Sequence, residues 1–163
     1  MEARLAVAGV STAAIIALVF AFGHSDRVSK PMNINGDIVG MDSETPAAYQ
    51  QRARATLEAA DAPAFALITF TEPLSAAEAA RILEPLPRVN ARVTDTVVVP
   101  LPEPVHGATR VAVFGSDSIP GVVAYAPGDA LREVAKDERV FAIEVLPSDA
   151  AWGRFGIRPV HVS

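Results

Sequence analysis

The chain has 163 residues, a formal net charge of −5 and no cysteine. This length suits one domain with a sizeable core, and the lack of cysteine excludes disulfides, thiol chemistry and thiolate-bound metals. Its 14 basic residues are spread without a basic stripe, so we expect no nucleic-acid partner. Abundant Ala, Val, Arg and Pro with few lysines is typical of a bacterium with a high GC content.

The first apolar segment runs from Leu5 to Phe22 without a charged residue. As a helix rising about 1.5 Å per residue it would span about 27 Å, close to the roughly 30 Å hydrocarbon core of a bilayer. We therefore predict a single transmembrane anchor over residues 1–22, held in the lipid bilayer of the cell membrane, with the remaining chain on the extracytoplasmic side. A cleaved export signal is the main alternative, and a buried globular helix is the other.

Small residues recur at every fourth position of this predicted anchor, at Gly9, Ala13, Ala17 and Ala21. They would line one helix face, where a second membrane helix could approach closely. These four residues are therefore candidate partner-binding residues, and the partners would be other membrane-protein subunits. The competing interpretation is coincidence, because alanine is abundant along the whole chain.

Residues 23–44 have neither helical nor strand periodicity, so we expect an extended tether there. Thr45 and Pro46 then provide an N-cap and a first-turn proline for an amphipathic helix over residues 45–61.

Strand and helix patterns alternate over residues 62–146. The expected order is strand 62–73, helix 75–84 with a Ser75–Glu78 capping box, long strand 89–99, short strand 109–115, strand 121–126, helix 129–137 capped by Asp129, and strand 140–146. Without the short strand, this order is strand-helix-strand twice over. It predicts an α+β fold, a ferredoxin-like split βαβ sandwich with two helices on one face of an antiparallel sheet.

The stretch GVVAYAPGDALREVAKDERVFAIE, residues 121–144, resembles the second half of the subtilisin-propeptide domain of the peptidase-inhibitor type. That family has a Gly-led strand, a helix ending in a Leu-x-x-x-x-Lys-Asp-like stretch, and a Val- or Ile-rich strand finishing in Glu. The resemblance covers roughly residues 64–146 and implies a protease inhibitor or a propeptide-like chaperone. In the family, the domain precedes a protease whose active site its carboxyl tail occupies. Because this sequence stops at Ser163, we expect such a role only in trans.

Catalytic groups are sparse in this sequence. His24, His106 and His161 lie in three separate segments without metal-ligand spacing, and nucleotide-binding and nucleophile-elbow motifs are missing. We therefore expect no metal, no cofactor and no small-molecule substrate. Asp95, on the buried face of a predicted strand, and Ser116, in a predicted turn, are the remaining candidates for a hydrolase. Structural roles are favoured for both.

Residues 147–163 form a C-terminal tail that holds the only tryptophan. Trp152, Arg154, Phe155 and Arg158 alternate aromatic and arginine side chains, the types that are enriched in binding hot spots. They are candidate partner-binding residues, and the alternative is that the tail folds back over the open face of the sheet. The sequence thus predicts a non-catalytic, membrane-anchored accessory subunit of a bacterial cell-envelope complex, respiratory or transport, with the protease inhibitor as the alternative.

Overall fold

The computed structural model describes residues 36–94, 97–103, 106–115 and 118–162. The predicted anchor with Gly9, Ala13, Ala17 and Ala21 lies outside these residues, as do Asp95 and Ser116. In the ranges that are described, none of the helices has the length and apolar character to cross a bilayer.

The described residues form an α+β fold, which confirms the predicted class. The elements follow one another as β1 (Ile38–Val39), α2 (Pro46–Glu58), β2 (Ala64–Leu74), α3 (Ala76–Ile82), β3 (Val89–Val93), β4 (Val98–Pro100), α4 (Arg110–Phe114), β5 (Ile119–Ala126), α5 (Gly128–Val134), β6 (Val140–Val145) and β7 (Gly156–Ile157).

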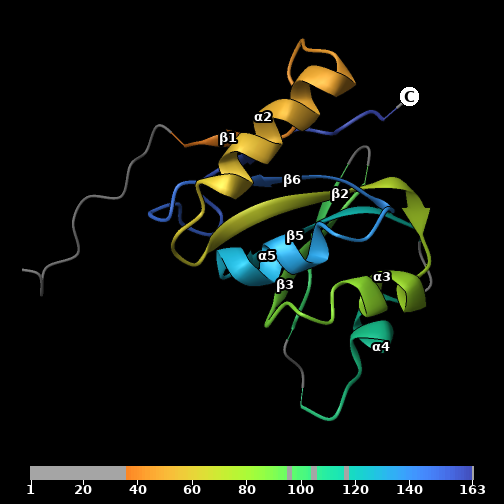
Figure 1. Ribbon diagram of the computed structural model, residues 1–163. Helices are drawn as coiled ribbons and strands as arrows, with labels where there is room; N and C mark the ends of the chain where they lie inside the picture. The colour runs from red at the N-terminus through yellow and green to blue at the C-terminus, as the bar shows by residue number, and fades with distance from the viewer. Residues whose placement is uncertain (1–35, 95–96, 104–105, 116–117, 163) are drawn as a thin grey trace, which may run out of the picture. The chain divides into compact units, whose positions relative to one another are not determined.

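A five-stranded sheet is the centre of the fold, with the order β4-β3-β5-β2-β6 and antiparallel neighbours throughout. The central strand β2 pairs Phe65 with Tyr125 of β5 and Ile68 with Ile143 of β6. Helix α3 connects β2 to β3, and α5 connects β5 to β6. Both helices lie on the same side of the sheet, and β1 lies on the other side (Figure 1).

Alternation along β2 divides its side chains between two apolar clusters. Ala66, Ile68 and Phe70 pack toward the helices, with buried residues such as Leu83 of the turn after α3 and Leu131 of α5. The intervening Phe65 and Leu67 belong to a second cluster on the opposite face. Because both faces of β2 are buried, its sequence is a nearly continuous apolar run rather than an alternating one.

The second face of the sheet is covered by β1 and by the C-terminal tail. Val39 of β1 is fully buried in this cluster, and Phe155, Ile157 and Val160 of the tail pack against it. Strands β1 and β7 pair in parallel as a separate two-stranded sheet. The expectation of an extended tether therefore fails for residues 36–44, because a two-residue strand pairing with a distant tail leaves no periodic signal in the sequence.

Helix α2 covers the outer edge of β6. The Gln50 side chain donates to the Phe141 carbonyl at 2.8 Å, and the Val145 N–H donates to the Thr56 hydroxyl at 2.8 Å. Such contacts satisfy edge groups that would otherwise be open to pairing with another chain. At the C-terminal end of α2, Arg132 donates to the carbonyls of Leu57 and Ala60, both at 3.1 Å.

The local predictions had mixed outcomes. The capping box between Ser75 and Glu78 is present at the start of α3, as predicted. The N-cap of α5 is Pro127, so the prediction of Asp129 as the cap was wrong, and Asp129 lies in the first turn. The predicted long strand 89–99 is instead two strands, β3 and β4, which pair as a hairpin.

The predicted short strand 109–115 is the helix α4. The Thr109 hydroxyl accepts from the Ala112 N–H at 3.3 Å and caps the helix. Arg110 then donates to the Leu83 and Leu86 carbonyls and to Glu103, and Phe114 is fully buried. These tertiary contacts override the alternating valines that indicated a strand.

Candidate functional site

Four aromatic side chains meet on the sheet face opposite the helices. Phe65 is at their centre, with ring centroids 4.9 Å from Tyr125, 5.3 Å from Phe155 and 5.7 Å from Trp152. Trp152 and Phe155 also contact each other edge to face, at 5.9 Å. We call Phe65, Tyr125, Trp152 and Phe155 the aromatic surface.

Strands β2 and β5 and the C-terminal tail bring these residues together. Phe65 and Tyr125 are direct cross-strand partners in β2 and β5, so their side chains lie on the same face. Trp152 and Phe155 come from the tail, where the Arg154 N–H donates to the Ala151 carbonyl at 3.0 Å and closes a turn. Gly153 has a φ of +76°, a conformation that this turn requires and that glycine adopts readily.

The aromatic surface combines a buried centre with exposed flanks. Phe65 is 8% exposed, whereas Trp152 is 41% and Tyr125 is 39% exposed. The exposed rings are therefore held by packing before any partner arrives, which reduces the entropy lost on binding. Trp and Tyr are also the side chains that most often dominate interface energetics.

The structure brings together only part of the predicted tail site. Trp152 and Phe155 belong to the aromatic surface, and the exposed Arg154 lies between them in sequence. Arg158 pairs instead with Asp42, at 2.9 Å, away from the aromatic rings. The tail also covers the sheet face, as the alternative interpretation expected. Phe65 and Tyr125 were missed, because each lies in a nearly continuous apolar run that does not distinguish an exposed ring from a core residue.

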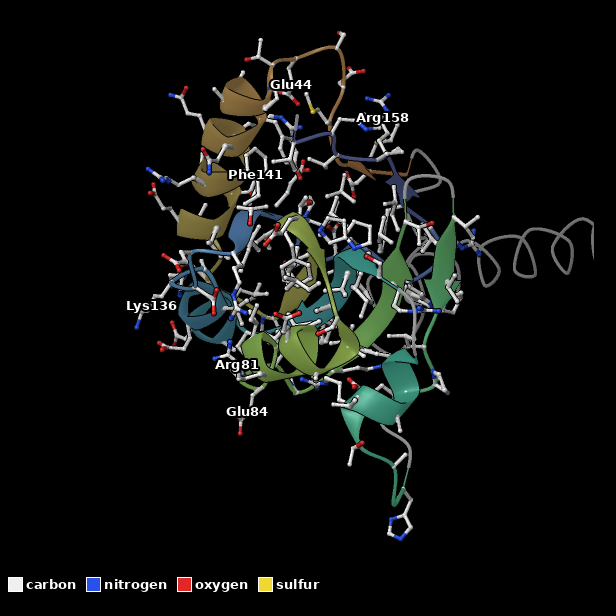
Figure 2. All side chains as sticks on the ribbon, turned by 90° about the vertical axis from the view of Figure 1, so that its right-hand side faces the viewer. Glu44, Arg81, Glu84, Lys136, Phe141 and Arg158 are labelled. Atoms are coloured by element: carbon white, nitrogen blue, oxygen red, sulfur yellow. The ribbon has the colours of Figure 1, made fainter. Side chains whose placement is uncertain are left out.

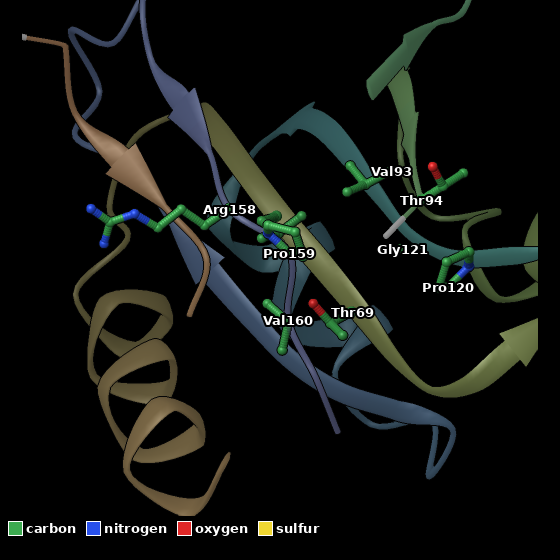
Figure 3. Close-up of a pocket in the computed structure, with 9 residues that line it drawn as sticks. Thr69, Val93, Thr94, Pro120, Gly121, Arg158, Pro159 and Val160 are labelled. Atoms are coloured by element: carbon green, nitrogen blue, oxygen red, sulfur yellow. The ribbon is translucent and has the colours of Figure 1, made fainter. Parts of the chain in front are cut away.

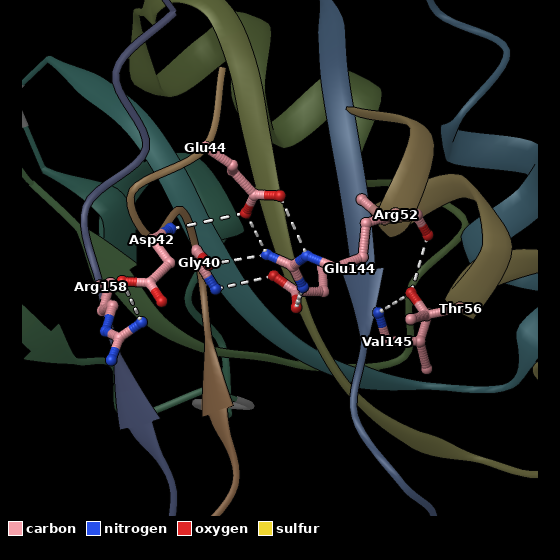
Figure 4. Close-up of polar contacts among 9 residues, drawn as sticks. Gly40, Asp42, Glu44, Arg52, Thr56, Glu144, Val145 and Arg158 are labelled. Atoms are coloured by element: carbon pink, nitrogen blue, oxygen red, sulfur yellow. Dashed lines mark hydrogen bonds and ion pairs between the residues drawn. The ribbon is translucent and has the colours of Figure 1, made fainter. Parts of the chain in front are cut away.

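A polar cluster links α2, β6 and residues 40–44 (Figure 4). Glu144 is 6% exposed, accepts from the Gly40 N–H at 2.7 Å and pairs with Arg52. Arg52 also donates to Glu44 at 2.7 Å, and this contact lowers the pKa of Glu44 below its ordinary value. Since these carboxylates are bonded to fixed partners, the cluster has the character of a structural ion-pair network rather than an acid/base pair.

Tyr49 lies beneath this cluster. Its hydroxyl is buried without a hydrogen-bond partner among the described residues, and its polar neighbours are Thr69 and Glu144. Burial, and next the negative charge of Glu144, raise the pKa of Tyr49 well above its ordinary value. The hydroxyl therefore stays protonated and is unsuited to act as a base near neutral pH.

The hollow between the tail and the sheet is too small for a substrate. Arg158, Pro159 and Val160 of the tail face Thr69 and Gly121 across a cavity of about 20 Å³ (Figure 3). That volume has room for roughly one water molecule. In the part of the chain that is described, no group of three His, Asp or Glu side chains is placed to hold a metal ion.

The helical side of the molecule has a different surface. Arg81, Glu84 and Lys136 point outward there, and all three are exposed (Figure 2). Glutamate and lysine side chains such as Glu84 and Lys136 are depleted from the cores of protein interfaces. The aromatic surface is therefore the stronger candidate for a binding site.

Comparison of the chain with models of protein families, with curated proteins and with solved structures gave no match. The resemblance to subtilisin propeptides therefore stays a prediction, based on the residues that suggested it.

Proposed function

We propose that this protein is a non-catalytic, membrane-anchored accessory subunit of a bacterial cell-envelope complex, and that it binds a partner subunit through the aromatic surface. The observation that carries this proposal is the pair of half-exposed rings, Trp152 and Tyr125, fixed around the buried Phe65. A single exposed apolar residue is common on protein surfaces. Several aromatic rings that are fixed in one patch are characteristic of interaction sites.

We further propose that residues 64–146 belong to the ferredoxin-like split βαβ class. The order β2-α3-β3-β5-α5-β6 supports this class, with β4 and α4 as an insertion between β3 and β5. The spatial order β3-β5-β2-β6 places the first and third strands of the motif in the middle, as a split βαβ arrangement requires. The anchor over residues 1–22 is proposed from its apolar sequence.

A protease inhibitor acting in trans is the second candidate, on the basis of the resemblance over residues 121–144 and the same strand order. The tail argues against it. In that family the carboxyl tail occupies the active site of the protease, whereas here Phe155 and Val160 pack on the sheet and Arg158 pairs with Asp42. The tail would have to leave these contacts to reach an active site, so the subunit role is better supported.

Co-purification from bacterial membranes in mild detergent tests the proposal, with mass spectrometry of the bound proteins. Trp152→Ala and Tyr125→Ala remove the exposed rings, and Val111→Ala is the control because Val111 is 42% exposed on the remote helix α4. We expect the wild type and Val111→Ala to retain the same partner in stoichiometric amounts. The aromatic variants should lose it, because a hot-spot ring contributes about 2 kcal/mol or more, roughly 30-fold in affinity.

Two outcomes would contradict the proposal. One is that the intact protein purifies as a monomer in its micelle, and the other is that both aromatic variants keep the partner as well as Val111→Ala does. Circular dichroism of each variant verifies that a lost partner does not result from a lost fold.

A further inference from the structure

The backbone of residues 36–44 lies directly against the tail, and we call these residues the strap. The Gly156 N–H donates to the Asp37 carbonyl and the Arg158 N–H donates to the Val39 carbonyl, both at 2.8 Å. The approach is too close for a side chain at two positions of the strap. A Cβ atom at Gly36 would lie 2.1 Å from the Arg154 oxygen, and one at Gly40 would lie 2.1 Å from the Arg158 oxygen.

Both backbone polar groups of Gly40 in the strap are bonded to the domain. The Gly40 N–H donates to the buried Glu144 carboxylate at 2.7 Å, and the Gly40 carbonyl accepts from Arg52 at 3.0 Å. Arg52 is itself fixed by Glu144 and Glu44. The strap is therefore attached to α2 and β6, two elements that do not depend on the tail for their own pairing.

The strap and the aromatic surface are joined through the same segment of the tail and the same apolar cluster. Phe155 lies between Arg154 and Gly156, whose backbones face the strap, and its ring packs on Phe65. Val39 of the strap is buried in the apolar cluster that contains Phe65. The tail residues next to the exposed tryptophan thus pack on the sheet and pair with the strap through their backbone.

We propose that the strap assembles the aromatic surface, so that attachment of Gly40 at Glu144 and Arg52 controls whether Trp152 and Phe155 stay on the sheet. The relevance of this inference to partner binding rests on the proposed function. Detaching the strap removes the backbone bonds of Gly156 and Arg158 and weakens the surface. By thermodynamic linkage, a partner that binds the aromatic surface also stabilises the attachment of the strap to the domain.

The test uses the full chain in detergent micelles and needs no partner. Gly40→Ala introduces a Cβ at a φ of +106° and against the Arg158 oxygen, which should push the strap off the tail. Gly107→Ala is the matched control, since Gly107 has a φ of +77° but nothing within 4 Å of a Cβ. Trp152 is the only tryptophan, so its emission and its quenching by acrylamide report on the tail alone.

We expect Gly40→Ala to shift Trp152 emission to longer wavelength and to raise amide exchange at Gly156 and Arg158 by about tenfold or more. Gly107→Ala should match the wild type in both. If Gly40→Ala does not fold, Glu144→Gln, which keeps the side-chain volume but removes the charge, takes its place. Unchanged Trp152 emission and unchanged exchange at both amides in a folded strap variant overturn the inference. Because neither measurement involves a partner, this failure is distinguishable from failure of the co-purification test.

Discussion

At the scale of single residues, Glu144 of β6 makes the polar contacts that matter most for holding the strap. It is a carboxylate with 6% side-chain exposure that accepts from a backbone N–H and from Arg52. The Glu144→Gln amide keeps one acceptor oxygen where the carboxylate has two, so either the Gly40 N–H or Arg52 loses its acceptor on this side chain, and the charge that faces Arg52 is lost. Since Arg52 is 41% exposed, water replaces part of the loss. We expect Glu144→Gln to lower the free energy of unfolding by about 2 kcal/mol.

Urea denaturation measures this change, and Glu133→Gln is the control. Glu133 also forms an ion pair, with Lys136, but both side chains are more than half exposed. Such surface pairs contribute less than about 1 kcal/mol. Equal shifts of the urea midpoint in the two variants would show that burial of Glu144 does not increase the stabilisation from its ion pair with Arg52.

At the scale of elements, sequence reasoning succeeded where a local signal was sufficient. The capping box at Ser75 and the apolar run of β2 both depend on neighbouring residues, and both were recognised. The prediction failed for α4, because Val111 and Val113 alternate like strand residues, while the helix is stabilised by the bond that its Arg110 donates to the distant Leu86 carbonyl. Thr109, a good N-cap, was the local signal that favoured a helix.

The turn from α5 to β6 has a pH-dependent contact. Arg139 donates to Asp137 at 2.8 Å and 3.0 Å and lowers the pKa of Asp137 to about 2. A carboxyl whose pKa is lower in the folded state stabilises the fold above its unfolded pKa, near 3.8, and this contribution is lost as the pH falls toward 2. We expect the wild type to be more stable than Asp137→Asn at pH 5, with the difference shrinking between pH 4 and pH 2.

Urea denaturation at each pH gives this difference. Arg139→Gln should reproduce the effect of Asp137→Asn, and the double variant should add little, because both changes remove the same pair. A difference between wild type and Asp137→Asn that is constant from pH 5 to pH 2 would contradict the assignment.

At the scale of the whole molecule, the candidate site depends on contacts that no local pattern contains. Trp152 was singled out from its residue type, but its partner Phe65 lies on a strand near the start of the domain. Their meeting requires the register of β2 with β5, the turn at Gly153 and the pairing of β1 with β7. Sequence reasoning offered a choice between a tail that binds a partner and a tail that covers the sheet. In the structure the tail covers the sheet and still presents an exposed ring.

Truncation of the tail tests whether the fold needs the tail as a cover for the sheet or is stable without it. Deleting residues 147–163 would expose Phe65, Leu67 and Val123, which the tail and the strap now cover. Exposed apolar surface of this kind binds hydrophobic dyes and promotes self-association. We therefore expect the truncated chain to bind such a dye, to self-associate in size-exclusion chromatography and to unfold at a lower urea concentration. Deleting only residues 161–163 is the control, because His161 is exposed and the residues that pack on the sheet remain. A tail built to enter a protease would be dispensable for folding, so a truncated chain as stable and monomeric as the control would favour the inhibitor over the subunit.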